Sequence, residues 1–204
     1  MLDGLKRDWA EPLRRSLAKP LAKAGFTPNQ VTLLGLALVL LNCAFFVWHQ
    51  NTFWFGLGIG VSFAFDALDG AVARLRNMSS KFGGYLDGVV DRYQEIAVYA
   101  AIGWVTGWWA LVFLTLTGSL MVSYNKARTA IEIPIKNHAW PDLLERFERV
   151  VILSLALLLD SILTLPDVLG GSVLFVALLV LGILAHGTAI QRFFRARAML
   201  TQKD

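Results

Sequence analysis

The sequence has few charged residues and hardly any cysteine. Only 17% of its 204 residues are Asp, Glu, Lys or Arg, whereas 56% are hydrophobic, which excludes an ordinary water-soluble domain of this length. The single cysteine, Cys43, excludes a disulfide within the chain and a metal site built from several cysteines. No apolar signal-peptide core precedes Gly25, so we expect no removable leader.

Formal charge is missing altogether from three long segments, 25–65, 96–125 and 168–190. Each is long enough for at least one membrane span of about 20 residues. Polar turns divide the chain further, and the resulting pattern predicts an all-α integral membrane protein with six transmembrane helices. We expect these helices at about 31–48, 53–66, 82–103, 107–124, 143–163 and 168–190.

Residues 2–24 have a different pattern, in which apolar side chains recur every four residues among six Lys and Arg. Such a segment is typical of an amphipathic helix that lies in the membrane interface. Pro12 and Pro20 interrupt the periodicity, so an ordinary basic tail is the alternative. The sequence therefore predicts two parts, an interfacial helix at 1–24 and a six-helix transmembrane domain at 25–204.

The basic residues are all on one side of the membrane if the six spans are threaded in this way. The turns at 49–52, 103–107 and 160–167 contain none of the 19 Lys and Arg residues. By the positive-inside rule the basic side is cytoplasmic. We therefore expect a protein of the inner or plasma membrane with both termini and the aspartates between residues 66 and 91 on the cytoplasmic side. This arrangement explains the net charge of +4 better than nucleic-acid binding, which we do not expect.

Four aspartates stand out in this apolar chain: Asp66, Asp69, Asp87 and Asp91. At helical spacing they form two pairs that converge from the second and third spans. Because one acid at membrane depth costs about 2.5 to 3.5 kcal/mol, four of them need cations nearby. Carboxylate oxygens suit Mg²⁺ or Mn²⁺, and four aspartates can hold two such ions.

The same run of residues resembles the signature of the CDP-alcohol phosphotransferase family. That signature is Asp, two residues, Asp-Gly, two residues, Ala-Arg, eight residues, Gly, three residues, Asp, three residues, Asp. The six-span layout resembles the family as well. The resemblance implies transfer of a substituted phosphate from a CDP-linked lipid to an alcohol, with release of CMP. It also implies metal binding by the four aspartates, a general-base role for Asp91, and a CDP site lined by Gly70, Ala73, Arg74 and Gly83.

Two further segments, 123–128 and 144–149, resemble the inositol-phosphate branch of the family, which includes phosphatidylinositol phosphate synthases and their archaeal-lipid counterparts. The resemblance implies inositol phosphate as acceptor and a pocket for its phosphate made by Lys126, Arg128, Arg146 and Arg192. Several cations around one phosphate make chemical sense, because guanidinium groups bind it through two hydrogen bonds. The alternative is that these bases are only the positive flanks of the spans. Glycerol 3-phosphate is another acceptor that such a pocket would admit, and the family implies a homodimer surrounded by membrane lipids.

Two other classes of function compete with a transferase. Acids inside a membrane also mark the ion paths of cation or proton-coupled transporters, but such a path predicts acids along the whole depth of the bundle. A scaffold protein would need neither four acids nor the glycines beside them. Release of CMP from a CDP-lipid would separate the three.

Overall fold

The computed structural model describes residues 2–133, 144–166 and 171–201 of the chain, with side chains from residue 11 onward. The described residues are helical, and their only β-type pairing is an isolated bridge between Thr164 and Ser172. The helices are α1 (Leu2–Lys23), α2 (Pro28–His49), α3 (Thr52–Asp66), α4 (Asp69–Leu75), α5 (Lys81–Thr106), α6 (Trp109–Glu132), α7 (Arg146–Asp160) and α8 (Val173–Thr201). The all-α class expected from the sequence is confirmed.

Local signals in the sequence account for where the long helices begin and end. Thr27 caps α2 by a reciprocal pair of hydrogen bonds, in which its hydroxyl accepts from the Gln30 amide at 3.3 Å and the Gln30 side chain accepts from the Thr27 amide at 2.8 Å. The Asn51 side chain caps α3, and the Ser80 hydroxyl caps α5 by accepting from the Gly83 amide at 3.0 Å. Gly107 ends α5 with φ of 74°, in the left-handed region that favours glycine.

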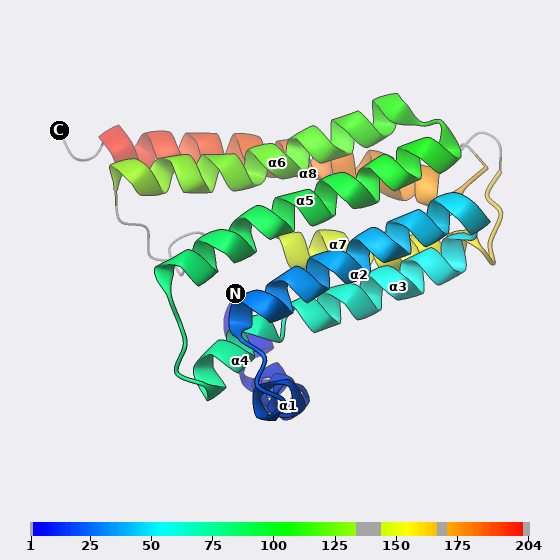
Figure 1. The fold of residues 1–204 in the computed structure, drawn as a ribbon. Helices are drawn as coiled ribbons and strands as arrows, with labels where there is room; N and C mark the ends of the chain where they lie inside the picture. The colour runs from blue at the N-terminus through cyan, green and yellow to red at the C-terminus, as the bar shows by residue number, and fades with distance from the viewer. Residues whose placement is uncertain (1, 134–143, 167–170, 202–204) are drawn as a thin grey trace.

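The long helices run alongside one another in a bundle (Figure 1). α2 packs against α3 and α5, α3 packs against α7, and α6 packs against α8. The core between them is apolar and includes Phe46, Phe55, Ile102, Leu157 and Leu178, all fully buried. Phe46 and Phe55 stack face to face with ring centroids 4.0 Å apart, which joins α2 to α3.

Within the described part of the chain, three helical segments are long and apolar enough to cross a membrane: α2, the combined α3–α4 segment Thr52–Leu75, and α8. α5 and α6 are longer than 20 residues, but both carry charged side chains. Those of α5 lie toward its start, between Lys81 and Glu95, and those of α6 lie in its last two turns, between Lys126 and Glu132. α7 has only 15 residues. A helix occupies each of the six expected positions, while the crossing of the membrane by α5, α6 and α7 stays a prediction.

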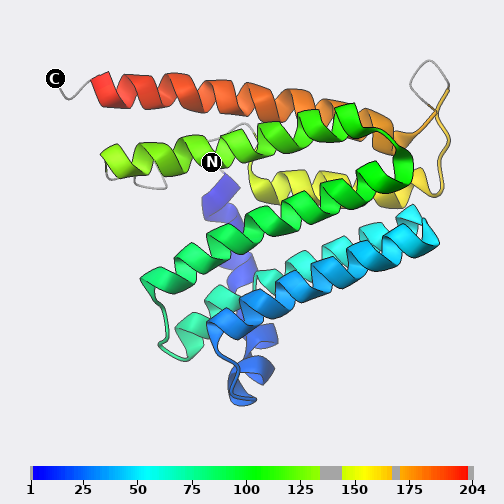
Figure 2. The same ribbon diagram turned by 45° about the horizontal axis from the view of Figure 1, so that its top comes forward.

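α1 forms a continuous helix in spite of Pro12 and Pro20. It crosses one end of the bundle beside α4, as the two views show (Figures 1 and 2). Ala18 is buried there in a small apolar cluster with Val31, Leu68, Ala71 and Val72. On the other side Leu13 and Leu17 are 56% and 52% exposed, which is the pattern expected of a helix with one face toward lipid. Its place in the interface stays a prediction.

Candidate functional site

The second expected span is broken inside the aspartate motif. α3 ends at Asp66, α4 begins at Asp69, and Ala67 and Leu68 form a turn between them. The Leu68 amide there donates to the Phe65 carbonyl three residues back, at 2.9 Å, where an α-helix would use the fourth. The expectation that a continuous helix carries both Asp66 and Asp69 was therefore wrong.

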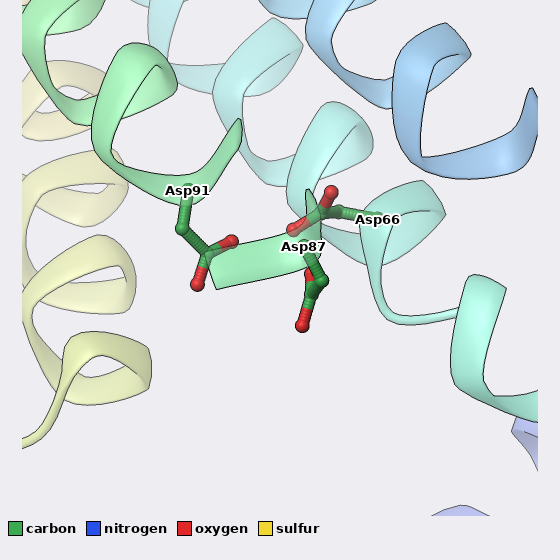
Figure 3. Close-up of side chains that lie close together, drawn as sticks. All are labelled: Asp66, Asp87 and Asp91. Carbon is green, nitrogen blue, oxygen red and sulfur yellow. The ribbon is translucent and has the colours of Figure 1, made fainter. Parts of the chain in front are cut away.

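Three of the four aspartates come together across two helices. Asp66 at the end of α3 and Asp87 and Asp91 on α5 each offer a carboxylate oxygen, and these oxygens lie within 4.8 Å of one another. Figure 3 shows the three side chains gathered around the same space. Asp66 is buried, and the other two are half-buried. We call Asp66, Asp87 and Asp91 the acid cluster.

Asp69, the first residue of α4, lies beside the acid cluster, near enough to Asp66 and Asp87 for the like charges to repel one another. One of its carboxylate oxygens accepts a hydrogen bond from the Thr32 hydroxyl of α2 at 2.6 Å. The other accepts from the backbone amide of Gly70 at 2.5 Å. Asp69 is therefore held by α2 next to the three clustered carboxylates.

Arg146, the first residue of α7, places a positive charge on the acid cluster. Its guanidinium forms an ion pair with Asp91 and lies 3.4 Å from Oδ2 of Asp66. It also donates to the side-chain oxygen of Gln94 at 2.6 Å and lies over the ring of Phe63, 4.7 Å from the centroid. One arginine thus offsets part of the repulsion among three carboxylates.

α2 approaches the acid cluster closely at Gly35. A Cβ atom at this position would lie 3.0 Å from Oδ1 of Asp66 and 3.6 Å from Nε2 of Gln94. A larger residue would therefore displace the Asp66 carboxylate or the helix. Gly35 and Thr32 are one helical turn apart, so one stripe of α2 faces both Asp66 and Asp69.

A buried charge network supports the cluster from the side of α5. Arg92 lies 3.4 Å from Oδ2 of Asp91 and 3.5 Å from Oε2 of Glu95, and it also contacts the Ser123 hydroxyl of α6. Oε1 of Glu95 pairs with Arg149 of α7 at 2.9 Å, and these two side chains are only 5% and 2% exposed. The network joins α5, α6 and α7 behind Asp91.

The residues expected to line a CDP site are grouped around α4 and the start of α5. Gly70 is in the first turn of α4 and Gly83 in the first turn of α5. Ala73 is partly buried on α4, while Arg74 is exposed and pairs with Glu11 of α1 at 3.0 Å. Arg74 also borders an open pocket of about 780 Å³ between α1 and α4 that Arg14, Arg15 and Lys19 line as well.

The four bases expected to bind the acceptor phosphate occupy different surroundings. Arg146 is at the acid cluster. Lys126 is partly buried near the end of α6, and Arg128 is exposed and pairs with Glu132 at 2.5 Å. Arg192 of α8 is 5% exposed and donates to the carbonyl of Val122. Of these four bases, Arg146 contacts the clustered carboxylates, and a shared phosphate pocket stays a prediction.

Sequence reasoning missed several side chains that contact the acid cluster or its network: Thr32, Gly35, Gln94 and Glu95. One signal could have found two of them, because Gln94 and Glu95 follow Asp91 by three and four residues and so return to its face of α5. Thr32 and Gly35 lie in α2, outside the aspartate motif, and nothing local marks them.

The donor set suits a hard divalent cation. Three oxygen ligands from separate side chains lie close enough to share an ion, and Gly35 leaves room beside Asp66. The residues present therefore fit Mg²⁺ or Mn²⁺. The arrangement can bind phosphate oxygens through such an ion and can accept a proton at a carboxylate.

Comparison with known proteins agrees with this geometry. The family model described as CDP-alcohol phosphatidyltransferase matches residues 26–191. The chain is 34% identical to archaetidylinositol phosphate synthase of Pyrococcus horikoshii over 202 residues, which cover 98% of each protein. It is 36% identical to phosphatidylinositol phosphate synthase of Mycobacteroides abscessus over 155 residues, covering 72% of this chain and 69% of the relative.

The fold is similar to that of a solved enzyme. The crystal structure of Mycobacterium tuberculosis phosphatidylinositol phosphate synthase with CDP-DAG bound aligns with a TM-score of 0.78 at 24% identity, covering 91% of this chain and 94% of that one. The same enzyme in complex with manganese and citrate aligns with a TM-score of 0.77 at 25% identity, covering 90% and 88%.

Proposed function

This chain belongs to the CDP-alcohol phosphatidyltransferase family, and we propose that it transfers a phosphatidyl-type group from a CDP-linked lipid to inositol phosphate, releasing CMP. It is a transferase of phospholipid biosynthesis. Two relatives that share most of its length are named archaetidylinositol phosphate synthase and phosphatidylinositol phosphate synthase, which supports the acceptor. The observation that carries the proposal is the acid cluster, three carboxylates from two helices beside one arginine.

The proposed chemistry uses the acid cluster in two ways. Asp66, Asp87 and Asp91 would hold one or two divalent ions together with Asp69, and the solved relative with manganese bound supports divalent metal use. Such ions neutralise a diphosphate and its leaving group. Asp91 accepts the proton of the attacking acceptor hydroxyl, and its position between Arg92 and Arg146 orients the carboxylate for that transfer.

The two substrates would approach from different helices. Gly70, Ala73, Arg74 and Gly83 would contact the CDP part of the donor, because the two glycines and the alanine let a nucleotide come close to the backbone of α4 and α5. Arg146, with Lys126, Arg128 and Arg192, would hold the phosphate of the acceptor. Arg146 would place the acceptor phosphate next to the proposed metal site, because its guanidinium lies against Asp66 and Asp91.

The proposed setting is the cytoplasmic face of a membrane. The start of α5 and the ends of α6 and α8 lie at the same end of the bundle as α1 and α4 (Figure 1). The described Lys and Arg residues belong to these five helices, to the turn after α4 and to the first turn of α7. This distribution supports the proposal of six spans, with α1 at the interface and both termini in the cytoplasm. A homodimer in contact with membrane lipids is part of the proposal.

The test is release of CMP by the purified protein in detergent or nanodiscs. We expect release from CDP-diacylglycerol or its archaeal ether counterpart with inositol phosphate, dependent on Mg²⁺ or Mn²⁺ and abolished by a chelator. Glycerol 3-phosphate, inositol and serine are the comparison acceptors, with product masses recorded. If only glycerol 3-phosphate supports turnover, it is the acceptor in place of inositol phosphate. If no acceptor gives CMP release, the result contradicts the proposed transferase activity and favours a transporter.

A further inference from the structure

Gln94 is a fully buried polar residue on the face of α5 that carries Asp91. A buried amide is tolerated where its oxygen and nitrogen both have partners. Here both do. Nε2 donates to Oδ1 of Asp66 at 3.2 Å, and Oε1 accepts from the guanidinium of Arg146 at 2.6 Å.

The two partners of Gln94 belong to different helices and to different parts of the proposed reaction. Asp66 ends α3 and is one of the three clustered carboxylates. Arg146 begins α7 and is the cation expected at the acceptor phosphate. A side chain that donates at one end and accepts at the other can hold both, and neither a carboxylate nor an apolar side chain can do so.

The space around the amide is restricted, so Gln94 has little freedom to change partners. Gly35 of α2 closes one side, since a Cβ there would lie 3.6 Å from Nε2 of Gln94 and 3.0 Å from Oδ1 of Asp66. Arg146 closes the other side, because the same guanidinium lies 3.4 Å from Oδ2 of Asp66. The amide and the two charged groups thus form a closed set of contacts.

We propose that Gln94 is a positioning residue that couples the metal site to the acceptor site: it fixes the rotation of the Asp66 carboxylate and the place of the Arg146 guanidinium. The inference rests on the proposed function and deepens it. Loss of the amide therefore affects the affinity for the divalent ion and the KM for the acceptor together, while the KM for the CDP-lipid, whose expected contacts are on α4 and the start of α5, stays as it was.

The test uses Gln94→Met, which keeps the length and most of the volume of the side chain but removes both hydrogen bonds. We expect the affinity for Mn²⁺, titrated without substrates, to fall about tenfold, the effect typical of losing a group that orients a metal ligand. The KM for inositol phosphate should rise in the same variant, with the KM for the CDP-lipid unchanged.

The matched control is Thr115→Val. Thr115 is also fully buried, and its hydroxyl donates to the Leu178 carbonyl of α8 at 3.0 Å, so it too joins two helices, away from the acids. We expect Thr115→Val to change the melting temperature only.

The inference is overturned if Gln94→Met alters Mn²⁺ affinity and acceptor KM no more than Thr115→Val does. Failure of the proposed function is a separate result, because it is absence of CMP release by the unchanged chain. Even if the unchanged chain releases no CMP, the Mn²⁺ titrations of the two variants still test the role of Gln94 at Asp66, because they use no substrate.

Discussion

Asp91 has a basic group beside each of its carboxylate oxygens. Arg146 pairs with Oδ1, and Arg92 lies 3.4 Å from Oδ2. These two cations favour the ionised carboxylate, which is the form that can accept a proton from a hydroxyl, whereas burial and the neighbouring carboxylates Asp66 and Asp87 favour the protonated form. Arg146 and Arg92 thus offset part of the cost of keeping Asp91 ionised in the acid cluster.

Replacing Asp91 by Asn tests this role. The amide keeps the shape of the side chain but cannot accept the proton, so we expect kcat to fall by about 10² to 10⁴ with CDP-lipid binding largely retained. CMP release and binding of a labelled CDP-lipid measure the two effects. Asp160→Asn, at the far end of α7, is the control and should leave kcat unchanged; near-normal activity of Asp91→Asn would exclude the base assignment.

Gly35 is a residue whose importance is steric. Gly35→Ala would place a Cβ 3.0 Å from Oδ1 of Asp66, so the carboxylate or α2 must shift. We expect the affinity for Mn²⁺ to fall about tenfold, in the range seen when a metal ligand is misoriented. Isothermal titration measures it.

The matched control for Gly35→Ala is Gly60→Ala in α3, where a Cβ would meet no atom within 4 Å. This variant should bind Mn²⁺ as the unchanged chain does. If both alanine variants bind Mn²⁺ normally, α2 does not shape the metal site.

At the scale of elements, the turn at Ala67 and Leu68 gives Asp66 and Asp69 different hydrogen-bond partners. Asp66 contacts Gln94 of α5 and Arg146 of α7, whereas Asp69 accepts a hydrogen bond from Thr32 of α2. The break lets α4 turn toward α1, against which it packs. The aspartates of one short motif thus reach different neighbours.

The contact between α5 and α7 depends on an ion pair. Glu95 and Arg149 are 5% and 2% exposed and lie 2.9 Å apart. Removing one partner leaves a buried charge without its counterion, so we expect Glu95→Gln to lower the free energy of unfolding by about 3 to 5 kcal/mol. The midpoint of thermal unfolding in detergent reports the change.

The double variant Glu95→Leu with Arg149→Leu serves as the control for that prediction. Because it removes both charges, it should recover most of the lost stability, as apolar replacements of buried pairs often do. A double variant as unstable as Glu95→Gln would mean that the charges do not act as a pair.

At the scale of the whole molecule, the helices place every functional group discussed above at one end of the bundle. α3 ends there, α5 and α7 begin there, and α1 crosses it (Figures 1 and 2). A lipid substrate needs such a place, since its head group is in water and its tails are in the bilayer. The opposite end consists of the turns after α2, α5 and α7.

The proposed orientation can be tested with cysteine labelling, because Cys43 is the only cysteine to remove. In a Cys43→Ser background, Ser79→Cys lies in the exposed turn before α5 and Ser161→Cys follows α7 at the other end. We expect an impermeant maleimide to label Ser161→Cys in intact cells and Ser79→Cys only in opened ones. The reverse result would invert the orientation, and labelling of both in intact cells would contradict the six-span threading.

Much of the molecule was predictable from local patterns. Uncharged runs and the polar turns between them placed the long helices to within a few residues, because helix formation and its ends depend on neighbours in sequence. The spacing of the four aspartates predicted a shared site, and Asp66, Asp87 and Asp91 do converge. Positions of the acceptor bases were not predictable in this way, because they come from helices far apart in the chain.

The sequence by itself determined the helical class, the apolar character of the chain and the identity of the aspartates, since all three depend on composition and on spacing within a helix. Only the tertiary structure decided that Asp69 turns toward Thr32, that Gly35 leaves room beside Asp66, and that Gln94 joins Asp66 to Arg146. These facts depend on which helices pack together and how closely, and the packing of α2, α3, α5 and α7 is a property of many side chains at once.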